Sequence, residues 1–262
     1  MSLVLKSNQA ITSAPLLPAY DTYKARVLAD GGVIKNESLL LDVFLFMKEY
    51  GLDAAKVFSA TSANWGIKEV AGNVTKLYNL FDATGDIVLG TGTYPLQSSG
   101  NKFSLYSAGS AANKLQAVGT VTSKNLSIFL AYEKGASTTV AASALAEFWG
   151  VDNSVRGLNA TYAHNTGLYG ANAYGTTGAV VGVPYAKNIG ASVTPSGLKL
   201  YQNGAVVGSD LQVTSQAEQY LFVLASANAG AGAQGNYYAT IAAHDLTQSE
   251  ELAISKFVAD FI

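Results

Sequence analysis

The side chains that could carry out acid–base or nucleophilic chemistry are few in this sequence of 262 residues. It contains two histidines, His164 and His244, and neither lies near a motif that would activate a serine. The Gly-x-Ser-x-Gly turn that presents the serine of many hydrolases does not occur. His164 is predicted in a loop, whereas His244 is expected to hydrogen-bond to nearby backbone or to Asp245. We therefore predict that neither histidine is catalytic.

A glycosidase would need two carboxylates that face each other across a cleft. The acids in the predicted central strands are Glu133, Glu147 and Asp152. Glu133 and Glu147 each end a predicted strand, but the Glu-x-Asp-x-x-Glu pattern of jelly-roll glucanases is absent. We therefore predict that the chain is not an enzyme. Of three interpretations of the function, a glycosidase ranks third. The two that rank above it rest on residues 159–174 and on the order of segments along the chain, and both are described below.

Cofactor chemistry has equally little support in the sequence. Cysteine is absent, which excludes disulfide bonds, zinc knuckles and thiol catalysis. Residues 230–235 match the Gly-x-Gly-x-x-Gly pattern of dinucleotide sites, but a strand and not a helix is predicted after them. Without a following helix, no helix N-terminus can hold a pyrophosphate. We predict that the chain binds no cofactor.

The charge pattern argues against nucleic acid and membranes as partners. The sequence has 16 basic and 18 acidic residues, and Lys and Arg form no cluster that could follow a phosphate backbone. The most apolar run, residues 39–47, contains Asp42 and is too short to span a bilayer. Only 13% of the residues are charged, about half the usual share, so the surface tolerates burial against copies of itself. We therefore expect a homo-oligomer.

Aromatic and amide side chains gather between residues 159 and 174 in the style of a lectin. Lectin sites stack aromatic rings on sugar faces and add amide or hydroxyl hydrogen bonds. This pattern supports one function, a lectin-like module that recognises a cell-surface glycan, although tyrosines that pack in a β-sandwich would look the same. The candidate glycan-binding residues are Tyr162, His164, Asn165, Tyr169, Asn172 and Tyr174.

The N-terminal part is predicted to be an arm followed by helices. Two prolines favour an extended arm over residues 1–18, and residues 19–63 are expected to form a helical segment for attachment or assembly. Within that segment Asn36 is a plausible N-cap, and Gly51 ends the second helix. The candidate assembly residues are the two prolines and the residues that recur at helical spacing after them. They are Pro15, Pro18, Tyr20, Tyr23, Val27 and Leu28.

Residues 64–246 are predicted to form a β-sandwich. Short apolar runs with β-branched and aromatic residues alternate with Gly, Asn, Ser and Thr about every ten residues. Residues 126–132 are apolar on both faces, which indicates a central strand. Asn203-Gly204 predicts a two-residue hairpin turn. Residues 247–262 are expected to form a helix that packs on the sandwich, begun by a capping box at Thr247 and Glu250.

Three of these features together resemble the concanavalin A/laminin G-like jelly-roll family. They are the buried strand at 126–132, the hairpin at 196–207, and the aromatic strand at 237–243 followed by Leu-Thr-x-x-Glu. Laminin G domains that bind calcium use convergent acids, whereas Asp152, Asp210 and Asp245 are isolated here. We therefore expect a jelly-roll β-sandwich without a metal site.

The order of segments over residues 20–262 is similar to that of a group of bacteriophage virion structural proteins. In these, a segment like residues 25–32 precedes a short helix, a jelly roll and a terminal helix. The resemblance implies a capsid decoration, head-fibre or tail component, made in the host cytoplasm and located in the virion. It also implies other virion proteins as partners, a homotrimer as the favoured assembly, and a host surface glycan as a further partner. This is the leading interpretation, and the lectin-like module is the alternative.

Overall fold

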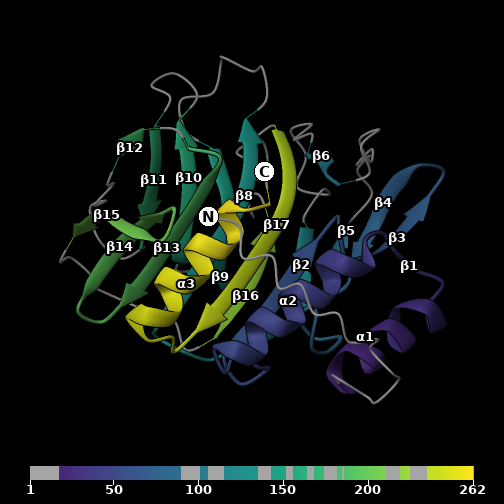
Figure 1. Ribbon diagram of the computed structural model, residues 1–262. Helices are drawn as coiled ribbons and strands as arrows, with labels where there is room; N and C mark the ends of the chain where they lie inside the picture. Colours follow the sequence, from purple (N-terminus) through teal and green to yellow (C-terminus); the bar gives the residue numbers. More distant parts are fainter. Residues whose placement is uncertain are drawn as a thin grey trace.

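The computed structural model describes residues 18–89, 101–105, 115–134, 143–151, 156–163, 168–173, 182–184, 186–210, 219–224 and 235–261. Within these ranges two antiparallel β-sheets pack face to face, and helices lie on one side of them (Figure 1). The prediction of a mainly β sandwich with helices before and after it is confirmed. The proposed arm lies outside the described residues except for Pro18, which begins a helix.

The larger sheet, sheet A, has ten strands in the described ranges. In spatial order they are β1 (Val33–Ile34), β3 (Gly66–Val70), β4 (Asn73–Leu77), β5 (Ile87–Leu89), β7 (Leu115–Val121), β16 (Tyr220–Leu224), β9 (Ser143–Gly150), β10 (Arg156–Ala163), β11 (Leu168–Asn172) and β12 (Val183–Pro184).

Sheet B has seven strands in the same ranges. In spatial order six are β15 (Ala205–Asp210), β14 (Gly197–Gln202), β13 (Asn188–Thr194), β8 (Leu126–Lys134), β17 (Gly235–His244) and β2 (Val57–Ser62). The seventh, β6 (Phe103–Leu105), pairs with the start of β17. The predicted central strand is β8, which lies between β13 and β17 and buries both of its faces.

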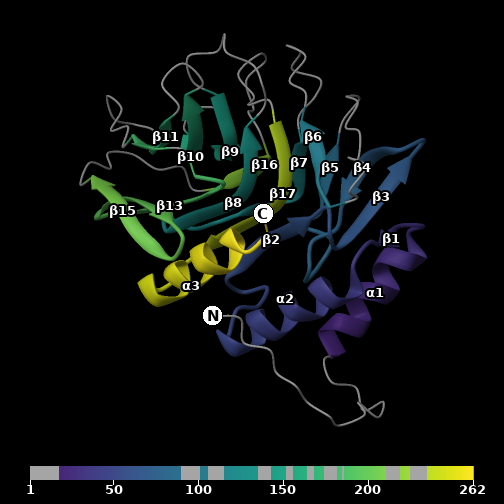
Figure 2. The same cartoon turned by 45° about the horizontal axis from the view of Figure 1, so that its top comes forward.

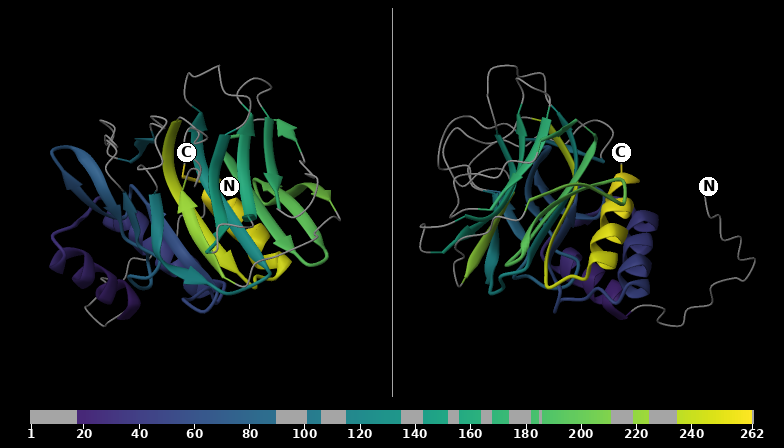
Figure 3. Two further views of the ribbon diagram at one scale, coloured as in Figure 1. Left: turned by 180° about the vertical axis from the view of Figure 1, so that it is seen from behind. Right: turned by 90° about the vertical axis from the view of Figure 1, so that its left-hand side faces the viewer.

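Two of the three helices in the described ranges form a third layer over the outer face of sheet B, and the other lies against the edge of sheet A. The three helices are α1 (Pro18–Ala29), α2 (Glu37–Glu49) and α3 (Gln248–Ala259). Figure 3 shows α2 and α3 side by side against this face, and Figure 2 shows α1 next to β1 and β3. One apolar core fills the space between the two sheets, and a second lies between sheet B and the helices. No helix in the described ranges is long and apolar enough to cross a membrane.

Local signals in the sequence match the observed ends of elements. Asn36 caps α2, since its side chain accepts a hydrogen bond from the Leu39 N–H at 3.0 Å. Thr247 and Glu250 form the predicted capping box of α3. Asn203 and Gly204 have φ values of 51° and 76°, the two positive angles that a type I′ hairpin turn requires.

The segment 19–63 contains more than the predicted helices. It also contributes β1 to the edge of sheet A and β2 to the edge of sheet B. β2 is fully buried, because it pairs with β17 and lies under the helices. The helical segment and the sandwich therefore share strands, so the helices are part of the folded domain.

α3 is held on sheet B by buried acidic side chains. Glu251 accepts hydrogen bonds from the hydroxyls of Ser127, at 2.9 Å, and Tyr201. Burial first, and then the bond to Glu251, raise the pKa of Tyr201, so this phenol stays protonated. Glu250 pairs with Lys56 at 2.5 Å, which ties the start of α3 to β2.

The Glu250 contact should make stability depend on pH. Burial acts to raise the pKa of Glu250, but Lys56 and Thr247 outweigh it and the pKa lies below the usual 4.5. A lowered pKa stabilises the fold above the unfolded-state value, and this stabilisation is lost as the pH falls through the folded-state value. We expect the loss of unfolding free energy between pH 7 and pH 3 to be smaller in Glu250→Gln than in the wild type, by urea denaturation. An identical loss in both proteins would contradict this.

Candidate functional site

The predicted glycan-binding residues do not form an exposed aromatic site where the structure describes them. Tyr169 is fully buried in the core between the sheets, where it shares a face of β11 with Ala171. The prediction that Tyr169 stacks on a sugar is therefore wrong. The rest of the set stays a prediction, since residues 164, 165 and 174 lie outside the described ranges, as do the side chains of Tyr162 and Asn172.

The two carboxylates considered for a glycosidase point to opposite sides of the sandwich. Glu147, on β9, alternates with core residues Ala146 and Phe148, so its side chain points to the outer face of sheet A. Glu133, at the end of β8, points to the helix side of sheet B, where the Tyr238 hydroxyl donates to it at 3.3 Å. The sandwich separates the two groups, so they cannot act together on one glycosidic bond.

Glu133 is occupied by a set of partners instead. Lys102 and the Asn236 amide donate to its carboxylate at 2.7 and 2.9 Å, and together with Tyr238 they hold the pKa of Glu133 below its usual value. His244 contacts Asp245 at 2.9 Å, as predicted. His164 and Asp152 lie outside the described residues. In the described ranges no three His, Asp or Glu side chains gather closely enough to hold a metal ion.

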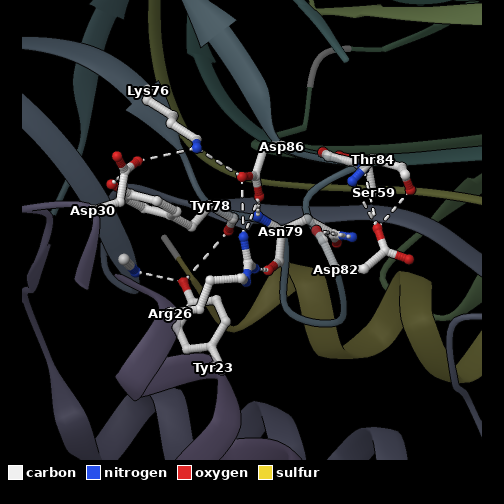
Figure 4. Close-up of polar contacts among 12 residues, drawn as sticks. Tyr23, Arg26, Asp30, Ser59, Lys76, Tyr78, Asn79, Asp82, Thr84 and Asp86 are labelled. Carbon is white, nitrogen blue, oxygen red and sulfur yellow. Dashed lines mark hydrogen bonds and ion pairs between the residues drawn. The ribbon is translucent and has the colours of Figure 1, made fainter. Parts of the chain in front are cut away.

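A network of charged side chains fastens α1 to sheet A (Figure 4). The carboxylate of Asp86, which has no exposed surface, accepts hydrogen bonds from Arg26 Nη1 at 2.9 and 3.0 Å. It also pairs with Lys76 at 2.9 Å and accepts the Asn79 N–H at 2.7 Å. Arg26 lies on α1, Lys76 lies on β4, and Asp86 directly precedes β5. One buried carboxylate therefore joins the helix to two neighbouring strands.

Asp30, just after α1, extends this network. It accepts a hydrogen bond from the Tyr78 hydroxyl at 2.8 Å and pairs with Lys68 and Lys76, both at 3.1 Å. The Tyr78 hydroxyl and the two lysines hold the pKa of Asp30 well below its usual range. Each charged group of the network has a partner of opposite charge, so the network has no free acid or base. We interpret it as a structural anchor.

The same anchoring removes two of the predicted assembly residues from the surface. Tyr23 and Val27 are buried within the chain, and the Tyr23 hydroxyl accepts the Gly66 N–H at 2.8 Å. The prediction that they contact a partner is therefore wrong, because β3 and α2 already cover that face of α1. Tyr20 packs its ring edge-on against Phe44. Pro18 and Leu28 are exposed, and Pro15 lies outside the described residues.

A groove between α2 and α3 is a candidate binding site in the described part of the chain. It has a volume of about 590 Å³, which falls within the usual size of small-molecule sites. Its walls come from the start of α2, the end of α3, and the turns beside β1, β2 and β6. We call it the α2–α3 groove. The residues that line it are Lys35, Asn36, Leu39, Asp42, Asn64, Asn101, Phe257, Asp260 and Phe261.

The aromatic wall of the groove is held rigidly. The Phe257 ring stacks on Phe46 with 4.0 Å between centroids, and it meets Phe261 edge-on at 5.2 Å. Phe261 also contacts the edge of Trp65, a fully buried residue. These contacts fix both rings against the second core, so the groove has a preformed apolar side.

Asn64 is the polar group in the groove that most clearly lacks a protein partner. Its backbone is used, since its N–H donates to the Ser62 hydroxyl and its carbonyl accepts the Asn36 N–H. Its side-chain amide makes no hydrogen bond within the described ranges, although the residue is only 5% exposed. An amide that faces the groove without a protein partner can both donate and accept hydrogen bonds with a ligand there. The amide therefore marks a place where a polar ligand would be stabilised.

The groove was not found from the sequence, because its residues belong to separate segments. Asn36 was identified only as a helix cap, and Phe257 and Phe261 lie in the segment that was expected to form the C-terminal helix. Asn64 and Asp260 carried no pattern. Short polar turns such as those at Asn36 and Asn64 occur in most sequences, so they do not by themselves predict a binding site.

No protein-family model matches the chain, and no curated protein matches its sequence. Among solved structures, a Trypanosoma rangeli sialidase in complex with 2,3-difluorosialic acid aligns with a TM-score of 0.51 and 12% identity, over 84% of this chain and 38% of the sialidase. A CBM40 domain of a Ruminococcus gnavus sialidase, bound to α2,3-sialyllactose, aligns at 0.39 and 16% identity over 50% of this chain and 82% of that domain. The receptor-binding domain of botulinum neurotoxin type G aligns at 0.49 and 10% identity over 77% of this chain and 51% of that domain.

The first of these similarities supports the β-sandwich fold and nothing further, because the sequence identity is low. The chain spans little more than a third of the sialidase that it resembles.

Proposed function

We propose that this chain is a non-catalytic carbohydrate-binding module and that the α2–α3 groove holds the sugar. The observation that carries the proposal is the composition of the groove, which combines amides, carboxylates and two phenylalanine rings in one cavity. Sugars present hydroxyl groups at their edges and C–H groups on their faces. Amides and carboxylates hydrogen-bond to the hydroxyl groups, and aromatic rings pack against the C–H groups.

The location of the groove also suits binding without catalysis. It lies outside the sandwich, between two helices whose positions are set by caps and buried polar contacts. A preformed site loses little conformational entropy when a ligand binds. The groove is therefore shaped to hold a ligand before the ligand arrives.

Replacing Asn64 with alanine should weaken glycan binding about tenfold, because one hydrogen bond between the amide and the sugar is worth about 1–1.5 kcal/mol. A glycan array should first identify a bound oligosaccharide, and calorimetric titration should then give the dissociation constants of the wild type and the variant. Asn73→Ala is the matched control, since Asn73 is an amide outside the groove that contacts its own turn. Equal affinities in the wild type and Asn64→Ala would exclude the groove as the site.

A structural role in a bacteriophage particle is a second proposal, which rests on the order of segments along the chain. Val88 and Val118 favour an assembly role, since they are 44% and 63% exposed and lie diagonally on the outer face of adjacent strands β5 and β7. Exposed apolar side chains that adjoin are a feature of contact surfaces. The two roles are compatible, because a virion protein can also bind a sugar on the host surface.

A further inference from the structure

The sign of the charge in the α2–α3 groove leads to an inference about the sugar, one that rests on the function proposed above. Three charged side chains line the groove, namely Lys35, Asp42 and Asp260. Lys35 is already neutralised, because its ammonium pairs with Glu69 at 2.9 Å. Neither Asp42 nor Asp260 forms an ion pair within the described part of the chain, and both are exposed to the groove and to solvent.

The helix dipoles do not offset these carboxylates. α2 presents its N-terminal end to the groove and α3 presents its C-terminal end, as Asn36 and Asp260 show. The partial charges at these two ends have opposite signs and roughly equal size. The side chains therefore decide the charge of the groove, which is negative.

A negative groove selects among sugars by their own charge. An acidic sugar would bring its carboxylate close to Asp42 and Asp260, and no unpaired arginine or lysine lines the described walls to receive it. A sugar with a free amino group would place an ammonium near the same carboxylates, where unlike charges attract. Asn64 and the rings of Phe257 and Phe261 do not depend on charge, so they would bind the sugar ring in either case.

We propose that the α2–α3 groove selects sugars that carry a free amino group over neutral sugars, and excludes acidic sugars such as sialic acids. The selection is electrostatic, so added salt should reduce it, because salt screens charges that remain near solvent.

The test uses two matched pairs of oligosaccharides with the full chain, by calorimetric titration. The first pair is a glucosamine disaccharide and its N-acetylated form, and the second is lactose and 3′-sialyllactose. We expect the free amine to bind about tenfold more tightly than its acetylated form, and lactose to bind more tightly than sialyllactose. In Asp42→Asn and Asp260→Asn both preferences should shrink, whereas Glu49→Gln, which removes a charge from the far end of α2, should retain them.

Two negative results have different meanings. If sialyllactose binds more tightly than lactose, or if the aspartate variants keep the preference of the wild type, the charge selection is wrong. Provided that Asn64→Ala still weakens binding, the groove would remain a sugar site. If none of the four sugars binds in a way that depends on Asn64, the proposed function itself fails.

Discussion

Replacing Asp86 with alanine should lower the free energy of unfolding by about 3 kcal/mol, because its removal breaks a buried pair of opposite charges. The carboxylate has no exposed surface and neutralises Arg26 and Lys76 together. Its removal would leave two cations side by side and the Asn79 N–H without an acceptor. Both cations reach solvent, at 24% and 23% exposure, so the loss should lie at the lower end of the range for buried pairs.

Urea denaturation at pH 7 would measure this loss, with Asp21→Ala as the control. Asp21 is an exposed acid on the same helix, and surface changes of this kind usually alter stability by less than about 0.5 kcal/mol. Hydrogen exchange should also become faster in α1, because its anchor to sheet A is broken. If Asp86→Ala and Asp21→Ala have similar stabilities, the network is not an anchor.

Replacing Glu251 with alanine should lower the free energy of unfolding by a similar amount, about 3 kcal/mol, because two buried donors lose their acceptor. The donors are the hydroxyls of Ser127 and Tyr201, and the Tyr201 hydroxyl has one further hydrogen bond, with the Ser192 hydroxyl at 3.2 Å. Thermal and urea denaturation would measure the effect. Glu251→Gln should lose less, since an amide oxygen can still accept a hydrogen bond.

Glu49→Ala provides the comparison for Glu251, because it removes an exposed glutamate from a helix of the same layer. A loss in Glu251→Ala no greater than that in Glu49→Ala would show that the buried bonds do not hold α3. Glu251→Ala should also expose the apolar side of α3 that faces sheet B, whose buried residues include Ile254 and Val258. Binding of a hydrophobic dye would report that exposure.

The parts of the fold that depend on neighbours in sequence could be predicted. The caps at Asn36 and Thr247, the turn at Asn203 and the buried strand β8 each arise from a few consecutive residues. The order of strands in the sheets could not be predicted, because pairs such as β17 with β2 join residues about 180 positions apart, as between Ala239 and Ser62. The β-strand propensity of a segment does not indicate which distant strand it pairs with.

Side-chain direction limited the prediction of sites in the same way. Alternation along β11 places Tyr169 on one face with Ala171, but it does not say which face meets the other sheet. The anchor and the groove were missed because their members lie far apart in sequence, as do Arg26 and Asp86, or Asn64 and Phe257. Polar residues in such clusters resemble ordinary surface residues until the fold brings them together.

The position of β17 has a consequence for how the protein is made. This strand is the last of the described strands along the sequence, yet it lies between β8 and β2 in sheet B. Until β17 has been made, β2 lacks its pairing strand in sheet B and β8 can pair only with β13. Pairing between strands so distant in sequence slows folding, because a long loop must close before the contacts form. The middle of sheet B is therefore completed only after β17 has been made.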